Sequence, residues 1–275
     1  MKHSKTFLEL EPEYAQYKTS KFVVVPCPHE KSVSCGKGTK YGPQAILDAS
    51  FFVENFDEEL KSETYRKAGI HTMKSCAVNR LPLTVKKILK DKKIPIILGG
   101  EHSLTPEAVR VAADNYPKLS VLQFDAHADL RDEYHGSKKS HACAMRRALE
   151  ICPVVQVGIR NISPEEFAFA QKTEQIKKIH FAEHLDIVEK VVAQLSEYVY
   201  ITFDVDAFDA SVMPSTGTPE PGGFFWYEVL DIIREVCRFK KVVAADFVEL
   251  SPIKGFFAPD FTVAKLIYRV MGYLT

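Results

Sequence analysis

The chain has 275 residues, of which 46% are hydrophobic, so it is long and apolar enough to fold around a large core and is not a disordered protein. Lysine and arginine total 36, aspartate and glutamate also total 36, and the formal net charge is zero. A balanced chain has no bulk electrostatic attraction to nucleic acid or to an anionic membrane, so we expect neither partner and look for a local site.

Short apolar runs rich in valine and isoleucine alternate along the chain with longer amphipathic segments. Strands are predicted at residues 22–26, 94–98, 120–124, 154–158, 179–181, 198–203 and 242–245. Helices are predicted at residues 43–55, 83–90, 106–115, 141–151, 164–171, 185–195, 226–239 and 259–272. Apolar strands separated by helices are typical of an α/β fold with a mostly parallel sheet covered on both faces. No linker or repeat interrupts this alternation, so we expect a single domain over residues 1–275.

The cysteines and the N-terminal segment bear on the compartment. The six cysteines are scattered, and none forms a C-x-x-C pair of the kind found in zinc knuckles and redox motifs. The first residues, MKHSKTFLELEPEYAQYK, are acidic where a signal peptide is apolar, and the longest apolar runs are too short to span a bilayer. We therefore expect a cytoplasmic protein with free thiols.

Three predicted strands are followed by acidic and histidine motifs. ILGGEHS contains His102, LQFDAHADLRD contains Asp125, His127 and Asp129, and ITFDVDAFD contains Asp204 and Asp206. Residues two apart in an extended segment share one face, so the carboxylates of each motif can project together. In open parallel sheets, ligands bind beyond the carboxyl ends of the strands, where these motifs fall.

Four carboxylates and two imidazoles at one edge of a sheet would repel one another without a cation. Two divalent ions would neutralise the four negative charges, and oxygen and nitrogen ligands without thiolate favour manganese over zinc or iron. Two metals that share carboxylates can activate water and polarise a substrate. Each motif alone has an ordinary structural explanation, as a turn, a cap or a hydrogen-bonded histidine, but three on three strand ends are difficult to explain in that way.

GGEHS, DAHAD and DVDAFD, followed by TGTPEPGG, resemble the ureohydrolase family of arginases, agmatinases and their relatives, from about Gly36 to nearly the C-terminus. The resemblance implies an arginase-like three-layer fold, two Mn²⁺ ions per chain, and hydrolysis of a guanidino group with release of urea. It also implies the ligands of each metal. One ion would be bound by His102, Asp125, Asp129 and Asp204, and the other by His127, Asp125, Asp204 and Asp206. Asp125 and Asp204 would then be the bridging residues.

The same resemblance suggests roles for residues outside the ligand set. His141 would transfer protons, Glu249 would bind the guanidinium group, and the hydroxyl group of Thr218 would lie close to the metals. Asp246 is a weaker candidate for support of the site. From the residues alone, these positions could equally be a helix start, a turn cap and a loop residue.

The substrate is predicted from the segments around the site. TGTPEPGG resembles agmatinases, and the segments after Asp129 and after VGIR lack the residues with which arginases hold an amino-acid head group. LRDEY and SHACAMRR resemble prokaryotic relatives that act on aminopropylagmatine. We therefore expect agmatine or aminopropylagmatine as substrate, with putrescine or spermidine as product in polyamine biosynthesis.

Asp132 and Glu133 are predicted to attract the ammonium group of such a substrate at the mouth of the site, although a solvated loop face explains them equally well. The resemblance also implies self-association as a trimer or hexamer. Three alternatives stay open at this point: an arginase or other guanidino-acid ureohydrolase, a deacetylase-like amidohydrolase with one zinc ion, and an inactive binding protein.

Overall fold

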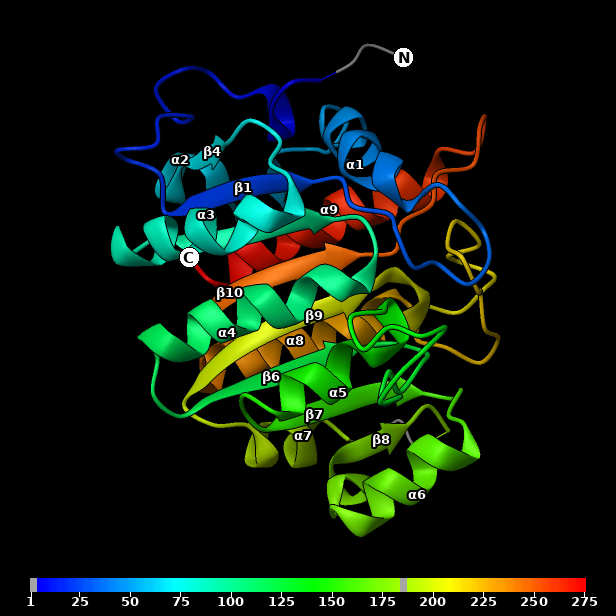
Figure 1. Ribbon diagram of the computed structural model, residues 1–275. Coiled ribbons are helices and arrows are strands. Elements are labelled where there is room, and N and C mark those ends of the chain that lie inside the picture. The colour runs from blue at the N-terminus through cyan, green and yellow to red at the C-terminus, as the bar shows by residue number, and fades with distance from the viewer. Residues whose placement is uncertain (1–3, 184–186) are drawn as a thin grey trace.

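The structure is a computed structural model that describes residues 4–183 and 187–275 (Figure 1). Its centre is an eight-stranded sheet with the order β4-β1-β5-β10-β9-β6-β7-β8. The strands are β1 (Phe22–Cys27), β4 (Ile70–Thr72), β5 (Ile94–Gly99), β6 (Leu119–Phe124), β7 (Val154–Ile159), β8 (Ile179–Phe181), β9 (Tyr198–Asp204) and β10 (Lys241–Val248). Each neighbouring pair is parallel, so the α/β prediction with a mostly parallel sheet is confirmed. A separate hairpin joins β2 (Phe56–Asp57) to β3 (Ser62–Glu63).

Helices cover both faces of the sheet and make the fold three layers thick (Figure 1). Figure 1 shows α3, α4 and α5 in front of the sheet, with α8 and α9 behind it. The α-helices are α1 (Gly42–Ser50), α2 (Thr64–Ala68), α3 (Leu81–Lys90), α4 (Thr105–Asn115), α5 (Ala144–Leu149), α6 (Pro164–Lys172), α7 (Val188–Gln194), α8 (Trp226–Phe239) and α9 (Ala258–Tyr273). None of the described helices is long and apolar enough to cross a membrane.

Each face of the sheet carries its own hydrophobic core because the strands are apolar on both sides. In α8 the buried residues recur with helical spacing, at Val229, Ile232, Ile233 and Val236, so one stripe of this helix packs on the sheet. The opposite core is formed with α3, α4 and α5. Two packed faces leave the carboxyl ends of the strands as the place where polar side chains can gather.

Several predicted boundaries differ from the structure. The helix predicted at residues 43–55 ends at Ser50, whose hydroxyl group donates to the Leu47 carbonyl (2.7 Å) and accepts from the Leu8 N–H (2.8 Å). The segment predicted as a helix at 141–151 begins with a 3-10 turn, η5 (His141–Cys143), before α5. Strand β4, three residues long at one edge of the sheet, was not predicted. The predicted helix start at Leu185 lies outside the described residues.

Candidate metal centre

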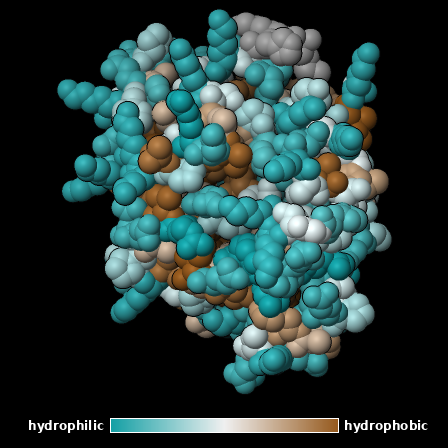
Figure 2. All heavy atoms as spheres, in the orientation of Figure 1, coloured by the Kyte–Doolittle hydropathy of each residue, from teal (hydrophilic) through white to brown (hydrophobic). Residues whose placement is uncertain are grey.

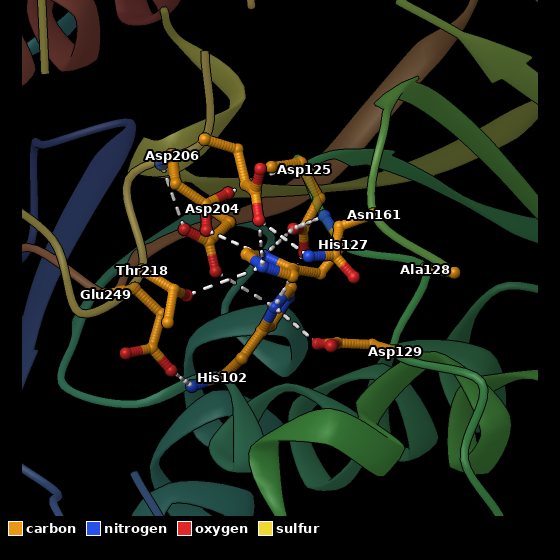
Figure 3. Close-up of polar contacts among 12 residues, drawn as sticks. His102, Asp125, His127, Ala128, Asp129, Asn161, Asp204, Asp206, Thr218 and Glu249 are labelled. Carbon is orange, nitrogen blue, oxygen red and sulfur yellow. Dashed lines mark hydrogen bonds and ion pairs between the residues drawn. The ribbon is translucent and has the colours of Figure 1, made fainter. Parts of the chain in front are cut away.

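The predicted ligands come together at the carboxyl ends of β5, β6 and β9. In the sheet, β5 and β9 lie on either side of β10, and β6 lies next to β9. His102 begins the 3-10 turn η4 (His102–Leu104) after β5, and Asp206 lies in η7 (Val205–Ala207) after β9. Figure 3 shows the side chains of the two histidines and four aspartates pointing toward one another. The sheet order thus joins residues that are about a hundred positions apart in the sequence.

His102 is buried, and its Nδ1 atom faces three carboxylate oxygens, of Asp125 at 3.2 Å, Asp129 at 3.2 Å and Asp204 at 3.4 Å. Nδ1 has no hydrogen bond of good geometry. On the other side of the ring, Nε2 lies 2.8 Å from the Thr202 hydroxyl group, which donates its only proton to Asp246 at 2.6 Å. Thr202 must therefore accept from Nε2–H, so neutral His102 presents a lone pair at Nδ1 to three carboxylates. Only a proton or a metal cation relieves that arrangement.

The ligand atoms fall into two groups, each with its members within 4.8 Å of one another: His102, Asp125 and Asp129, and Asp125, His127 and Asp206. The Nδ1 atom of His127 lies 2.9 Å from Asp206 Oδ2 and 3.6 Å from Asp125 Oδ1. Asp125 belongs to both groups, which suits a bridging position. Asp204 contacts His102 as described, and its Oδ1 accepts the Asp206 N–H at 3.0 Å, but it belongs to neither group.

The charge distribution of the cluster favours a cation. Burial raises the pKa of Asp129 to about 7, and the charge of Asp125 contributes to the rise. Burial, Asp206 and Asp125 raise the pKa of Asp204 well above its usual value, and burial and Asp125 also raise that of Asp206. The pKa of Asp125 lies below its usual range, because its contacts with His102 and His127 outweigh burial. Divalent cations would stabilise the ionised form of all four carboxylates, so the donor set fits bound metal.

Buried glutamines that the sequence interpretation missed hold Asp125 in place. Gln123 donates to Asp125 Oδ2 at 2.6 Å, and Gln156 on the paired strand β7 donates to Gln123 Oε1 at 2.6 Å. Both glutamine side chains are fully buried. A polar residue inside an otherwise apolar strand was the available signal, since a buried amide needs partners.

Two of the candidate residues adopt a backbone conformation that L-residues rarely take. Asp129 has φ 52° and Glu249 has φ 64°. Glu249 follows β10, its N–H donates to the Gly100 carbonyl at 2.8 Å, and its Oε1 accepts the His102 N–H at 2.7 Å. Such conformations cost about 1–3 kcal/mol and persist where the surroundings impose them, often at functional sites. Burial raises the pKa of Glu249 to about 8.

A cavity of about 210 Å³ opens above the cluster. Seven of the candidate residues line it: His127, Asp129, His141, Asp204, Asp206, Thr218 and Glu249. Residues not predicted for the site also line it, among them Ser34, Arg131, Tyr134, Asn161 and Glu166. The Thr218 hydroxyl group lies 3.4 Å from His127 Nε2. His141 and Glu249 both line this cavity.

The structure does not bring Asp132 and Glu133 to this cavity. Asp132 is paired with Arg147 at 2.7 Å and Lys138 at 3.1 Å, and Glu133 is exposed. The carboxylate of Glu220 lies beside two residues that line the cavity: it accepts from Asn161 Nδ2 at 2.6 Å and is 4.0 Å from His127 Nε2. In the sequence, the feature that could have pointed to Glu220 was its place within the TGTPEPGG motif.

Comparison with known proteins identifies the family. A sequence model described as the Arginase family matches residues 20–272. The chain belongs to the arginase family. It is 37% identical to an N(1)-aminopropylagmatine ureohydrolase of Synechocystis sp., with 98% of this chain and 94% of that relative covered. It is 32% identical to an agmatinase of Pyrococcus horikoshii, with 96% and 95% covered.

Solved structures agree with this assignment. The crystal structure of an agmatine ureohydrolase of Thermoplasma volcanium matches 94% of this chain and 91% of its own with a TM-score of 0.84 and 29% identity. The predicted ureohydrolase membership, the arginase-like fold and the expectation of an enzyme similar to agmatinases are therefore confirmed.

Proposed function

We propose that this arginase-family protein hydrolyses the guanidino group of agmatine or aminopropylagmatine and releases urea together with putrescine or spermidine, a reaction of polyamine biosynthesis. The observation that carries the proposal is the pair of ligand groups sharing Asp125 at the floor of a cavity that also contains Glu249 and His141. The names of the similar proteins support the choice of substrate.

The proposed cofactor is a pair of Mn²⁺ ions. His102, Asp125, Asp129 and Asp204 would hold one ion, and His127, Asp125, Asp204 and Asp206 the other. The oxygen-rich donor set without thiolate supports manganese. Bound at these residues, the ions would supply activation of water for attack on the guanidino carbon.

Glu249 is proposed to bind the guanidinium group. Its carboxylate is nearly fully buried and lines the cavity, and among the described residues it accepts a hydrogen bond at one oxygen, from the His102 N–H. A guanidinium group can make two parallel hydrogen bonds to a carboxylate, which fixes both the position and the plane of the substrate. Thr218, beside His127, lines the same cavity and would stand close to the bound guanidinium group.

At the other end of the substrate, Glu220 is proposed to attract the ammonium group in place of Asp132 and Glu133, which do not line the cavity. Both oxygens of Glu166 already accept from backbone, the Leu130 N–H and the Ser163 N–H. Asp132 is neutralised by Arg147 and Lys138. Among the described acidic residues around the cavity mouth, Glu220 has no lysine or arginine within ion-pair distance, so its charge is available to a cationic ligand.

Hydrolysis transfers the water oxygen to the guanidino carbon, breaks one C–N bond, and leaves an amine nitrogen that must gain the proton that water loses. His141 lines the cavity, and burial lowers the pKa of its imidazole. A histidine with a low pKa gives up a proton readily, which suits a residue that carries it from water to amine.

We expect His141→Asn to keep its manganese but to lower kcat by about 10²-fold, in the range of a positioned acid or base. Asparagine retains a polar side chain of similar shape, so the cavity should persist. Metal content and steady-state urea release measure the two effects. A variant that loses its manganese would instead make His141 a ligand or a structural residue.

The proposal of self-association as a trimer or hexamer has some support in the surface. On the face shown in Figure 2, hydrophilic residues predominate, with apolar patches between them. Phe52 at the end of α1 and Phe256 before α9 are exposed, and Phe52 lies edge-on to Phe257. Exposed aromatic groups of this kind commonly mark contact surfaces. We expect light scattering to give three or six times the mass of one chain, and a monomer at micromolar concentration would contradict this.

We also propose a cytoplasmic location, which is supported by the six cysteines, all of them free thiols.

The experiment that tests the function is urea release from agmatine, aminopropylagmatine and other guanidino compounds after loading with manganese, with metal content measured on the same sample. Two ions per chain and turnover of a guanidino amine are expected. One ion per chain in fully active protein would favour a deacetylase-like site, and two ions without turnover of any guanidino compound would favour a binding protein.

A further inference from the structure

We propose that Ser32 and Ser34, in the loop after β1, position the imidazole of His141, and that Glu101 fixes which ring nitrogen carries the proton by acting through Ser32. This inference rests on the proposed function, because it assigns positioning residues to the proton transfer of His141. It concerns a loop for which the sequence interpretation gave no role in chemistry.

On one side of the imidazole, Ser32 links His141 to Glu101. The His141 N–H donates to Ser32 Oγ at 3.0 Å, and the ring Nδ1 lies 3.3 Å from the same oxygen. Ser32 Oγ donates in turn to Glu101 Oε1 at 2.8 Å. The Ser32 hydroxyl group therefore donates its proton in one contact and lies as an acceptor in the other two.

The hydrogen bonds of Glu101 decide the direction of these bonds. Its carboxylate is fully buried and accepts from the backbone N–H groups of Lys31 and Ser32, each at 2.6 Å, and from Ser103 Oγ at 2.5 Å. The Ser32 hydroxyl group donates its one proton to the same carboxylate, so Ser32 can offer only a lone pair to the imidazole. This geometry places the Nδ1–H of His141 toward Ser32 and the lone pair of the ring on Nε2.

On the other side of the imidazole, Ser34 lies between Nε2 and Tyr134. Ser34 Oγ is 3.0 Å from Nε2 and 3.0 Å from the Tyr134 hydroxyl group, and the Tyr134 ring is edge-on to the imidazole at 5.8 Å. Ser34, Tyr134 and His141 all line the cavity above the metal centre. Ser34 Oγ thus lies against Nε2 and the Tyr134 hydroxyl group at once, and these contacts hold Nε2 on the cavity side.

A glycine makes the close approach of this loop possible. A Cβ atom at Gly100 would lie 1.9 Å from the His29 carbonyl oxygen, so only glycine fits there. The Glu101 N–H donates to that same carbonyl at 2.8 Å. The loop is thereby fastened to the turn that also carries His102, and Ser32 and Ser34 reach a histidine more than a hundred residues away in the sequence.

The test is a double-mutant cycle on the manganese-loaded enzyme with Ser32→Ala and His141→Asn. We expect Ser32→Ala to lower kcat roughly tenfold, because small misplacements of a reacting group are costly, with the KM and manganese content close to those of the wild type. Ser32→Thr keeps the hydroxyl group and should recover most of the rate. In the His141→Asn background, Ser32→Ala should have no further effect, because the residue acts through the imidazole.

Ser140 provides a matched control, since its Oγ also lies 3.3 Å from His141 Nδ1 but, within the part of the chain that the structure describes, makes no hydrogen bond to Glu101. We expect Ser140→Ala to cost much less than Ser32→Ala. If Ser140→Ala lowers kcat as much as Ser32→Ala does, Ser140 would be as important as Ser32 for the Nδ1 contact, and the proposed role of Glu101 would be overturned. Equal losses from Ser32→Ala with and without His141 would show a general structural effect and overturn the proposal while leaving the function intact. Wild-type enzyme that releases no urea would overturn both.

Discussion

Replacement of Asp125 by alanine is expected to abolish manganese retention and to lower urea release by about 10⁴-fold or more, the scale of losses seen when a residue essential to the reaction is removed. Asp125 is fully buried and belongs to both ligand groups. Its two oxygens face both histidines, with Oδ2 3.2 Å from His102 Nδ1 and Oδ1 3.6 Å from His127 Nδ1. Alanine would remove the shared donor from both halves of the cluster.

The expected loss can be measured without turnover. A ligand that binds only the native state stabilises it by about 2.7 kcal/mol at a hundredfold excess over Kd, so manganese should raise the Tm of the wild type, and chelation should reverse the rise. Asp125→Ala should show neither shift. Asp114→Ala, at an exposed position in α4, is the matched control and should behave like the wild type. Full manganese content in Asp125→Ala would refute the assignment of Asp125 as a bridging ligand.

The candidate ligands could be predicted from sequence because each directly follows a strand and local spacing sets its direction. His102, Asp125 and Asp204 lie within three residues of the ends of β5, β6 and β9, and parallel strands bring such ends to one edge. The prediction needed the order of elements but no knowledge of side-chain partners.

The residues that orient those groups could not be predicted in the same way. Thr202 acts on His102 from another strand, and Ser32 reaches His141 across 109 positions, so no periodic pattern connects them. The Asp132 side chain points toward Arg147 in α5, with which it forms an ion pair. Local spacing does not predict this contact, because the arginine side chain can point in several directions. Local spacing determines where a chain can place a group, while long-range contacts determine which way the group points.

We expect agmatine and aminopropylagmatine to be hydrolysed with a kcat/KM about 10³-fold above that of arginine, because a site that pairs with one charged group rejects a ligand that presents the opposite charge. In the proposed binding mode, all three substrates would offer the same guanidinium group to Glu249, so that end would not discriminate. The other end carries a carboxylate in arginine, and the carboxylate of Glu220 lies beside residues that line the cavity. Arg131, which also lines the cavity, lies 3.9 Å from Glu166 and 5.3 Å from the Tyr134 ring, so its charge is already engaged.

A pair of matched variants locates this discrimination. Glu220→Gln keeps the hydrogen bond to Asn161 within reach but removes the negative charge, and it should raise the KM for the amines while reducing the preference over arginine. Glu133→Gln makes the same change at the exposed position first predicted for this role. A large effect of Glu133→Gln with none from Glu220→Gln would return the ammonium site to the loop after Asp129. If arginine is hydrolysed as well as both amines, the guanidino-amine specificity is excluded. The proposed metal centre and the hydrolysis of a guanidino group would stand, because Glu249 and the ligand cluster are proposed to contact only the end that all three substrates share.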